Sequence, residues 1–298
     1  MSQRHLDSVT IDFNVDSLLL LNITLAIIMF GVALNITLQD FKQILKKPKP
    51  VLVGVFSQFI LLPVITFILV LLLKPIPSIA LGMFMVAACP GGNISNFMTH
   101  YAKGNTALSV SLTAIATVLA LLLTPLNFQF WASLYDPSAR LLKSISISPF
   151  DLVKVMFLLL GLPLILGMIV RSYFSEFAKK ASPYFKTGSI IFFLLLIVLA
   201  FSKNIDVFLS YIKYVFVLVL VHNLIAFLTG YTVASSFRLN KKNKRTVAIE
   251  TGIQNSGLGL LLIFTFFDGL GGMALLAAFW GIWHIISGLL LATYWSKN

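Results

Sequence analysis

Charged residues are scarce in this sequence: only 11% of its 298 residues are Asp, Glu, Lys or Arg, while 58% are hydrophobic. This composition excludes a water-soluble domain, whose surface would need far more polar side chains. The mean hydropathy of +0.96 comes from long apolar runs, and a run of about 18 residues can cross a bilayer core. Residues 51–73 and 155–170 contain no acid or base at all. We therefore expect an all-α, multi-pass membrane protein.

Cysteine and catalytic signatures are also nearly absent. The single cysteine, Cys89, excludes an intrachain disulfide. The sequence contains no P-loop, no HExxH and no GxSxG motif, and no loop is long enough for a nucleotide-binding domain. We therefore expect neither an enzyme nor an ATP-driven pump. Residues 1–16 lack the pattern of a signal peptide, so we expect the first span to insert without cleavage.

Nine apolar stretches are predicted to cross the membrane, with boundaries uncertain by several residues. They are residues 17–37, 51–73, 77–99, 106–132, 150–170, 187–203, 212–236, 246–267 and 272–295. Residues 135–150 then form a longer connector, which we expect to be partly helical along the membrane surface.

Lysine and arginine gather in alternate loops of this arrangement. Seven lie on one side, counting Lys154 just inside a span, and fifteen lie on the other. The richer side holds Lys42, Lys46, Lys47, Lys49, Lys103, Arg171, Lys179, Lys180, Lys186, Arg238, Lys241, Lys242, Lys244, Arg245 and Lys297. Because basic residues are enriched in cytoplasmic loops, we expect residues 1–16 to be an external tail and the C-terminus to be cytoplasmic. The net charge of +12 has the same explanation, so we expect no nucleic-acid partner.

Two of the nine stretches carry polar residues and helix breakers in their middle. The third contains Cys89, Pro90, Gly91, Gly92, Asn93, Ile94, Ser95 and Asn96, and the eighth contains Glu250, Thr251, Gly252, Ile253, Gln254, Asn255, Ser256 and Gly257. Irregular backbone inside a bilayer is tolerated only where it is buried in protein or lines a cavity. Freed carbonyl oxygens can bind a cation, and half-helix N-termini favour an anion. Packing of small residues between helices is the alternative reading for the proline and glycines.

The two broken stretches occupy matching places in the two halves of the chain. Each is the second-to-last span of its half, and their span numbers differ by five, so they cross the membrane in opposite directions. That arrangement is typical of an inverted structural repeat around a shared binding site. The first half then lacks one helix relative to the second.

Glu250 is the one acid that lies well inside a predicted span, since Asp151 is at the very end of the fifth. A buried carboxylate costs about 2.5 kcal/mol or more to insert, so it needs a partner, and a bound cation is the natural one. A proton carrier and a structural hydrogen bond are the alternatives. Oxygen ligands suitable for sodium are plentiful: Ser109 and Thr113 share one helical face, and Gln58 stands alone in an apolar span. Thr117 is expected to bond only its own backbone.

Two histidines lie within spans. His284 is a candidate donor to a substrate, and a packed, hydrogen-bonded histidine is an equal alternative. His222 and Asn223 are expected to hold helices together. With no cysteine or second acid beside them, we expect no transition-metal site.

These residues resemble the bile acid:sodium symporter family, whose members include intestinal and liver bile acid carriers and bacterial homologues. The matching residues, which extend over nearly the whole chain, are Met29, Phe30, Gly31, Gln58, Phe59, Cys89 to Gly92, Ser95, Asn96, Leu108 to Val110, Glu250 to Ser256 and Leu290 to Trp295. The resemblance implies a panel domain (17–37, 150–170 and 187–203) beside a core domain (51–73, 77–99, 106–132, 212–236, 246–267 and 272–295). The two discontinuous helices would cross in the core, within a transporter domain of residues 17–298.

The resemblance also implies the sites. The first sodium site would comprise Ser95, Asn96, Ser109, Thr113 and Glu250. The second would comprise Gln58, Glu250, Gln254 and the carbonyl groups of Thr251 and Ile253. The substrate would lie near Asn93, Asn255 and His284. Asn93 stands where the family has a threonine, and Ile285 where it has an asparagine, so smaller carboxylates such as keto acids or pantoate-like molecules join bile acids as candidates.

The resulting hypothesis is a symporter of the bacterial inner membrane that imports an organic anion together with two sodium ions by alternating access. We expect it to act as a monomer in the lipid bilayer. A proton-coupled or sodium-independent transporter is the first alternative. A membrane receptor that binds its ligand without moving it is the second.

Overall fold

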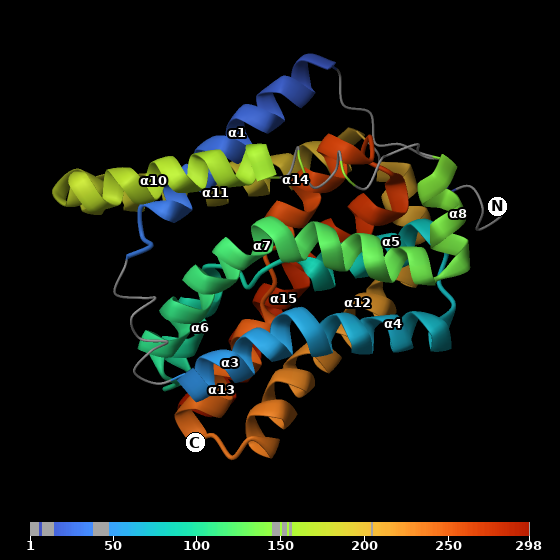
Figure 1. Ribbon diagram of the computed structural model, residues 1–298. Helices are drawn as coiled ribbons and strands as arrows, with labels where there is room; N and C mark the ends of the chain where they lie inside the picture. The colour runs from blue at the N-terminus through green and yellow to red at the C-terminus, as the bar shows by residue number, and fades with distance from the viewer. Residues whose placement is uncertain are drawn as a thin grey trace.

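The computed structural model describes residues 6–7, 15–37, 48–144, 150, 154, 157–203 and 205–297. Their regular structure is almost entirely helical (Figure 1), as the composition predicts. The helices are α1 (Val15–Ala33), α3 (Pro48–Phe56), α4 (Leu62–Leu73), α5 (Pro77–Ala88), α6 (Ile94–Tyr101), α7 (Thr106–Leu134), α8 (Asp136–Ser144), α10 (Leu162–Tyr173), α11 (Ser175–Lys203), α12 (Ile205–Ser236), α13 (Lys241–Gly252), α14 (Ser256–Phe266) and α15 (Gly271–Lys297), with π-helical turns η2 (Ser57–Leu61) and η3 (Phe157–Gly161).

Several of these helices are long and apolar enough to cross a membrane. Within the described residues there are four such stretches, Pro48–Leu73, Thr106–Leu134, Tyr211–Ser236 and Gly271–Lys297. Shorter apolar helices occupy Ile23–Ala33, Pro77–Ala88, Leu162–Tyr173 and Ser256–Phe266. Helices cover most of the described part of each predicted span. The chain is therefore a multi-pass α-helical membrane protein.

The helix limits differ from the predicted spans at a few places. α1 ends at Ala33, four residues before the predicted limit, and α11 begins at Ser175 rather than at 187. The reason at α11 is that hydropathy marks only the apolar part of a helix, whereas polar turns extend it beyond the bilayer core. α8 supplies the expected helix in the connector 135–150. Most of the predicted external tail (1–16) and residues 38–47 lie outside the described residues.

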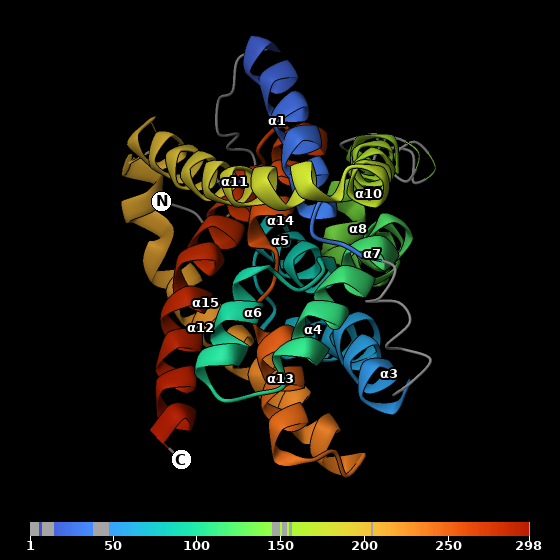
Figure 2. The ribbon, with the colours of Figure 1, turned by 90° about the vertical axis from the view of Figure 1, so that its left-hand side faces the viewer.

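The helices form two groups that lie side by side. α1, α10 and α11 pack on one another, and the remaining helices form a larger group, of which α14 lies level with α10 in the view of Figure 1 and α3, α4 and α13 lie below it. The rotated view in Figure 2 shows the same division. In the larger group, α5 packs on α7 and α15, and α12 packs on α13. The two broken helices, α5–α6 and α13–α14, both belong to this larger group.

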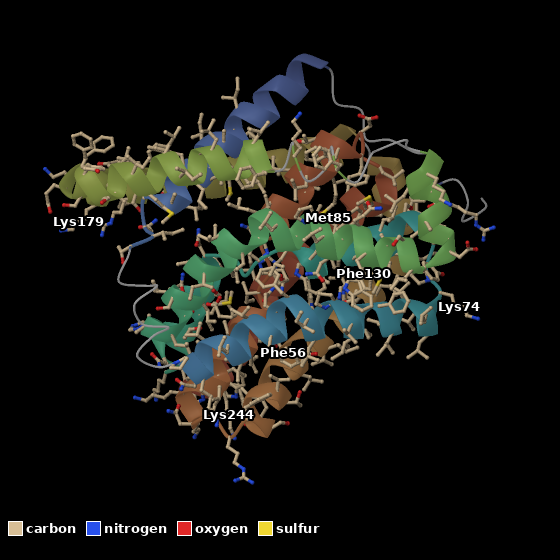
Figure 3. The ribbon with its side chains drawn as sticks, in the orientation of Figure 1. Phe56, Lys74, Met85, Phe130, Lys179 and Lys244 are labelled. Carbon is tan, nitrogen blue, oxygen red and sulfur yellow. The ribbon has the colours of Figure 1, made fainter. Side chains whose placement is uncertain are left out.

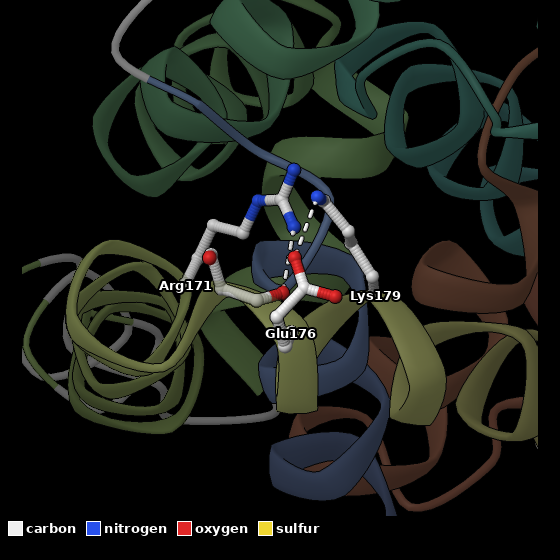
Figure 4. A network of polar contacts seen from close by, with 4 residues as sticks. Arg171, Glu176 and Lys179 are labelled. Carbon is white, nitrogen blue, oxygen red and sulfur yellow. Dashed lines mark hydrogen bonds and ion pairs between the residues drawn. The ribbon is translucent and has the colours of Figure 1, made fainter.

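Basic side chains mark the ends of the helices. Figure 3 shows Lys74 at one end of the molecule and Lys179 and Lys244 toward the other. At the turn between α10 and α11, Arg171 donates to the Ser175 carbonyl at 3.3 Å, and Lys179 Nζ lies 2.8 Å from Glu176 Oε1 (Figure 4). The hydrogen bond from Lys179 and its positive charge lower the pKa of the exposed Glu176 carboxyl. This pair lies before the apolar part of α11, on the side that the sequence predicts to be cytoplasmic.

Candidate functional site

The first break separates α5 from α6. Cys89, which ends α5, is extended (φ −69°, ψ 153°), because the ring of Pro90 disfavours a helical conformation in the preceding residue. The chain resumes a helix at Ile94, after Asn93. Proline therefore stops the helix where the sequence predicts, and the two glycines that follow form the unwound segment.

The second break separates α13 from α14. Ile253, at the end of α13, is extended (φ −106°, ψ 91°). Asn255 begins the next half-helix, and its side-chain oxygen accepts a hydrogen bond from Leu258 N at 3.0 Å. This N-cap satisfies one of the free backbone N–H groups at the start of α14.

The two unwound segments cross in direct backbone contact. Gly92 N donates to Ile253 O and Asn255 N donates to Pro90 O, each at 2.8 Å, around an antiparallel bridge between Gly91 and Gln254. The approach is so close that a Cβ atom at Gly91 would lie 2.8 Å from Glu250 Oε2. A side chain at this position would therefore displace the Glu250 carboxylate, and glycine avoids this.

The carboxylate of Glu250 lies at this crossing, surrounded by hydroxyl groups from α6 and α7. Ser95 Oγ donates to Glu250 Oε1 at 2.6 Å, Ser109 Oγ donates to the same oxygen, and Thr113 Oγ1 lies 3.1 Å from Oε2. The Asn96 side-chain oxygen is 3.4 Å from Thr113 Oγ1. Glu250 is only 5% exposed. The structure therefore brings together all five residues of the predicted first sodium site.

A second polar cluster forms around Gln58 and Gln254 at the crossing. Gln58 Nε2 donates to Gln254 Oε1 at 2.7 Å and to the carbonyl of Cys89 at 2.9 Å, and Gln254 Nε2 donates to the carbonyl of Thr251 at 2.7 Å. Gln58 Oε1 is buried and has no hydrogen-bond partner among the described residues. A buried carbonyl oxygen without a partner is costly. This oxygen is therefore free to bind a cation.

A π-helical turn places Gln58 in this cluster. The N–H of Leu62 bonds to Ser57 O, five residues earlier, and Pro63 follows with no N–H to give. The extra residue in the turn brings Ser57, Gln58 and Phe59 to the inner side of the helix together, and all three are buried.

Two backbone carbonyls complete the predicted second sodium site. Those of Thr251 and Ile253 each accept one hydrogen bond, from Gln254 Nε2 and Gly92 N. A carbonyl oxygen has a second lone pair, so both can still bind an ion. The side chains of Gln58 and Gln254 and the carbonyls of Thr251 and Ile253 therefore lie at the crossing, as Glu250 does.

The three residues predicted to contact substrate are less closely grouped. Asn93 and Asn255 are half-buried at the starts of α6 and α14, and the side chain of Asn93 does not cap its helix. His284 is 5% exposed in α15, and its Nδ1 lies 2.8 Å from the Trp280 carbonyl of the same helix. The described hydrogen bonds do not link His284 to either asparagine. The packed, hydrogen-bonded alternative thus describes His284 in this structure.

The structure adds polar residues that sequence reasoning missed. Ser57 Oγ lies 2.8 Å from Thr251 Oγ1, and Thr99 Oγ1 lies 3.3 Å from Ser109 Oγ. Ser57 could have been found from the sequence, because it is a polar residue next to Gln58 in an otherwise apolar span. Thr117 donates to the carbonyl of Thr113 at 2.7 Å, as expected for a hydroxyl that bonds its own helix.

The donor set determines which ion the crossing can hold. Its ligands are hydroxyl, amide and carbonyl oxygens with one carboxylate, and the part of the chain that the structure describes contains no group of three His, Cys, Asp or Glu side chains. Such hard, mostly neutral oxygen ligands suit a small monovalent cation better than a transition metal.

Comparison with known proteins finds similarity to sodium-dependent transporters. The family model described as the sodium bile acid symporter family matches residues 22–211. An uncharacterized sodium-dependent transporter of Bacillus subtilis is 37% identical over 93% of this chain and 83% of its own length. A probable chloroplastic sodium/metabolite cotransporter of Arabidopsis thaliana is 31% identical, covering 92% of this chain and 66% of that protein. The human ileal sodium/bile acid cotransporter is 29% identical, covering 80% and 67%.

Proposed function

Because this chain belongs to the sodium bile acid symporter family, whose members are sodium-dependent transporters rather than enzymes, we propose that it imports an organic anion together with two sodium ions. One observation carries this proposal. The buried Glu250 carboxylate meets three hydroxyl groups and forms no ion pair within the described residues. A buried charge without a counter-charge is unfavourable, and a bound sodium ion supplies that counter-charge.

The two ions would use the two polar clusters. The first would bind Ser95, Asn96, Ser109, Thr113 and Glu250, and the second Gln58, Glu250, Gln254 and the carbonyls of Thr251 and Ile253. Glu250 belongs to both sets, so its single negative charge would couple the ions. Both sets also hold together the two unwound segments, so sodium binding would stabilise the crossing.

The arrangement of helices supports transport by alternating access. We assign α1, α10 and α11 to a panel domain and the larger group to a core domain that moves against it. The chain would cross the plasma membrane, the inner membrane of a bacterium, nine times, with its N-terminus outside and its C-terminus in the cytoplasm. The broken helices would be equivalent parts of an inverted repeat.

The substrate would bind where the crossing meets the panel. Asn93 and Asn255 are half-buried, and the N-termini of α6 and α14 offer backbone N–H groups to a negative charge. These features suit a carboxylate, and relatives are named for bile acids and for unspecified metabolites. We propose a bile acid or a smaller carboxylate, such as a keto acid or a pantoate-like molecule. His284 would contribute only if its ring turns from the Trp280 carbonyl.

The proposal is tested with purified protein in two steps. A thermal-shift screen of bile acids, keto acids and pantoate, in sodium and in choline, identifies a compound that stabilises the protein only with sodium. Uptake of that compound into proteoliposomes is then measured with an inward sodium gradient. We expect uptake to cease when choline replaces sodium at constant pH. Uptake that persists in choline would indicate proton coupling or no coupling, and binding without uptake would indicate a receptor.

Replacing Gln58 with leucine is expected to raise the sodium concentration for half-maximal uptake about tenfold, because it removes one ligand and the bond to Gln254. The measurement is the sodium dependence of uptake at saturating substrate. Gln129→Leu is the matched control, since Gln129 is half-buried near the far end of α7. An unchanged sodium dependence for Gln58→Leu would remove Gln58 from the proposed site.

A further inference from the structure

The carbonyl groups at the end of α13 have hydrogen-bond donors from three different parts of the chain. Three consecutive carbonyls each accept one bond: Thr251 O from Gln254 Nε2 at 2.7 Å, Gly252 O from Asn223 Nδ2 at 2.8 Å, and Ile253 O from Gly92 N at 2.8 Å. The first and third belong to the crossing described above. The second comes from α12, which the proposed function does not use.

Asn223 is held in one orientation by a further bond. Its Oδ1 accepts from Ser287 Oγ at 2.5 Å, and the side chain is 1% exposed. The hydroxyl of Ser287 has one proton, and its other acceptors, two carbonyls of its own helix, are more distant at 3.1 and 3.3 Å. The amide of Asn223 therefore bridges α15 and the Gly252 peptide.

This bridge determines which carbonyls face the ion. Gly252 is the last residue of α13 and Ile253 is extended, so the chain changes conformation between these two carbonyls. Anchoring Gly252 O toward α12 turns Ile253 O toward the crossing, where it meets Gly92 N. Without the bond from Asn223, Gly252 O would be buried and unpaired, and only the bond from Ile253 N to Ile249 O at 2.9 Å would hold its peptide.

We propose that Asn223, oriented by Ser287, is a positioning residue for the second sodium site. It touches neither the ion nor the substrate. It fixes the Gly252 peptide so that the carbonyl of the next residue, Ile253, is presented to sodium, and it joins α12 and α15 to the break. This inference rests on the proposed function, since it concerns the affinity of the proposed second ion.

The test is a titration of purified protein with ²²Na⁺, which needs no knowledge of the substrate. Asn223→Leu keeps a similar volume but removes the donor, and we expect the second ion to bind about tenfold more weakly while the first is retained. Ser287→Ala, a milder change, should weaken it about threefold. Asn127→Leu is the control, because the bond of Asn127 among the described residues is the one it accepts from Trp131 of the same helix, α7.

If Asn223 only stabilised the fold, the measurements on Asn223→Leu would differ. Such a role would lower thermal stability in potassium and leave the sodium affinity unchanged. Wild-type affinity in Asn223→Leu would overturn the inference. If Asn223→Leu does not fold, wild-type affinity in Ser287→Ala overturns it. A wild-type protein that binds no ²²Na⁺ would instead refute the proposed function itself.

Discussion

Replacing Glu250 with glutamine is expected to lower the initial rate of sodium-driven uptake about 100-fold. The substitution keeps the size of the side chain but removes the one charge at the crossing, and it places an amide donor against the hydroxyls of Ser95 and Ser109. Losing one partner of a buried charge pair costs about 3 kcal/mol, which corresponds to this factor. The measurement is uptake into proteoliposomes with an inward sodium gradient.

Glu176→Gln is the matched control for this experiment. The Glu176 side chain is 76% exposed and pairs with Lys179 at the turn before α11, and an exposed pair of this kind contributes little. We expect its uptake to stay within about twofold of wild type. If Glu250→Gln kept sodium-driven uptake close to that of the control, with both proteins equally folded, Glu250 would not couple the ions.

Adding a methyl group at Gly91 is expected to lower uptake at least about tenfold and to destabilise the protein by about 2 kcal/mol. The new Cβ would lie 2.8 Å from Glu250 Oε2 and 3.3 Å from the Glu250 carbonyl. Glu250 Oε2 would have to give up its contact with Thr113 Oγ1 to turn away, and the Glu250 carbonyl belongs to the backbone of the other broken helix. Thermal unfolding in potassium and uptake in sodium measure the two effects separately.

Gly188→Ala is the same chemical change at an open position. A Cβ at Gly188 in α11 would meet no atom within 4 Å, so we expect wild-type uptake and no loss of stability. A Gly91→Ala protein that behaved like Gly188→Ala would show that the two segments do not cross as closely as described.

Sequence reasoning located the breaks because their chemistry is local. Proline and paired glycines stop a helix wherever they occur, and an acid within an apolar stretch can be recognised from the sequence alone as a candidate site residue. The spacing of Ser109 and Thr113 placed both hydroxyls on one face of α7, and the structure directs that face at Glu250. The resemblance to a known family supplied Ser95 and Asn96, which spacing alone did not assign.

Other features depend on contacts that no local pattern records. One extra residue in the turn Ser57–Leu61 decides that Gln58 faces Gln254, and hydropathy is insensitive to such a shift. Asn223 joins α12 to α15 and to α13, as predicted for a residue that holds helices together, but no local pattern shows that one of its partners is the Gly252 carbonyl at the end of α13. The imidazole of His284 is paired within its own helix, with the Trp280 carbonyl four residues earlier.

Equilibrium binding of ²²Na⁺ to the purified wild-type and Glu250→Gln proteins tests the central claim most directly, since it requires neither a substrate nor a gradient. The crossing of two broken helices around one carboxylate predicts two sodium ions per wild-type chain and none at the same concentration for Glu250→Gln. Glu176→Gln should bind as the wild type does. Two ions bound to Glu250→Gln with unchanged affinity would contradict the account.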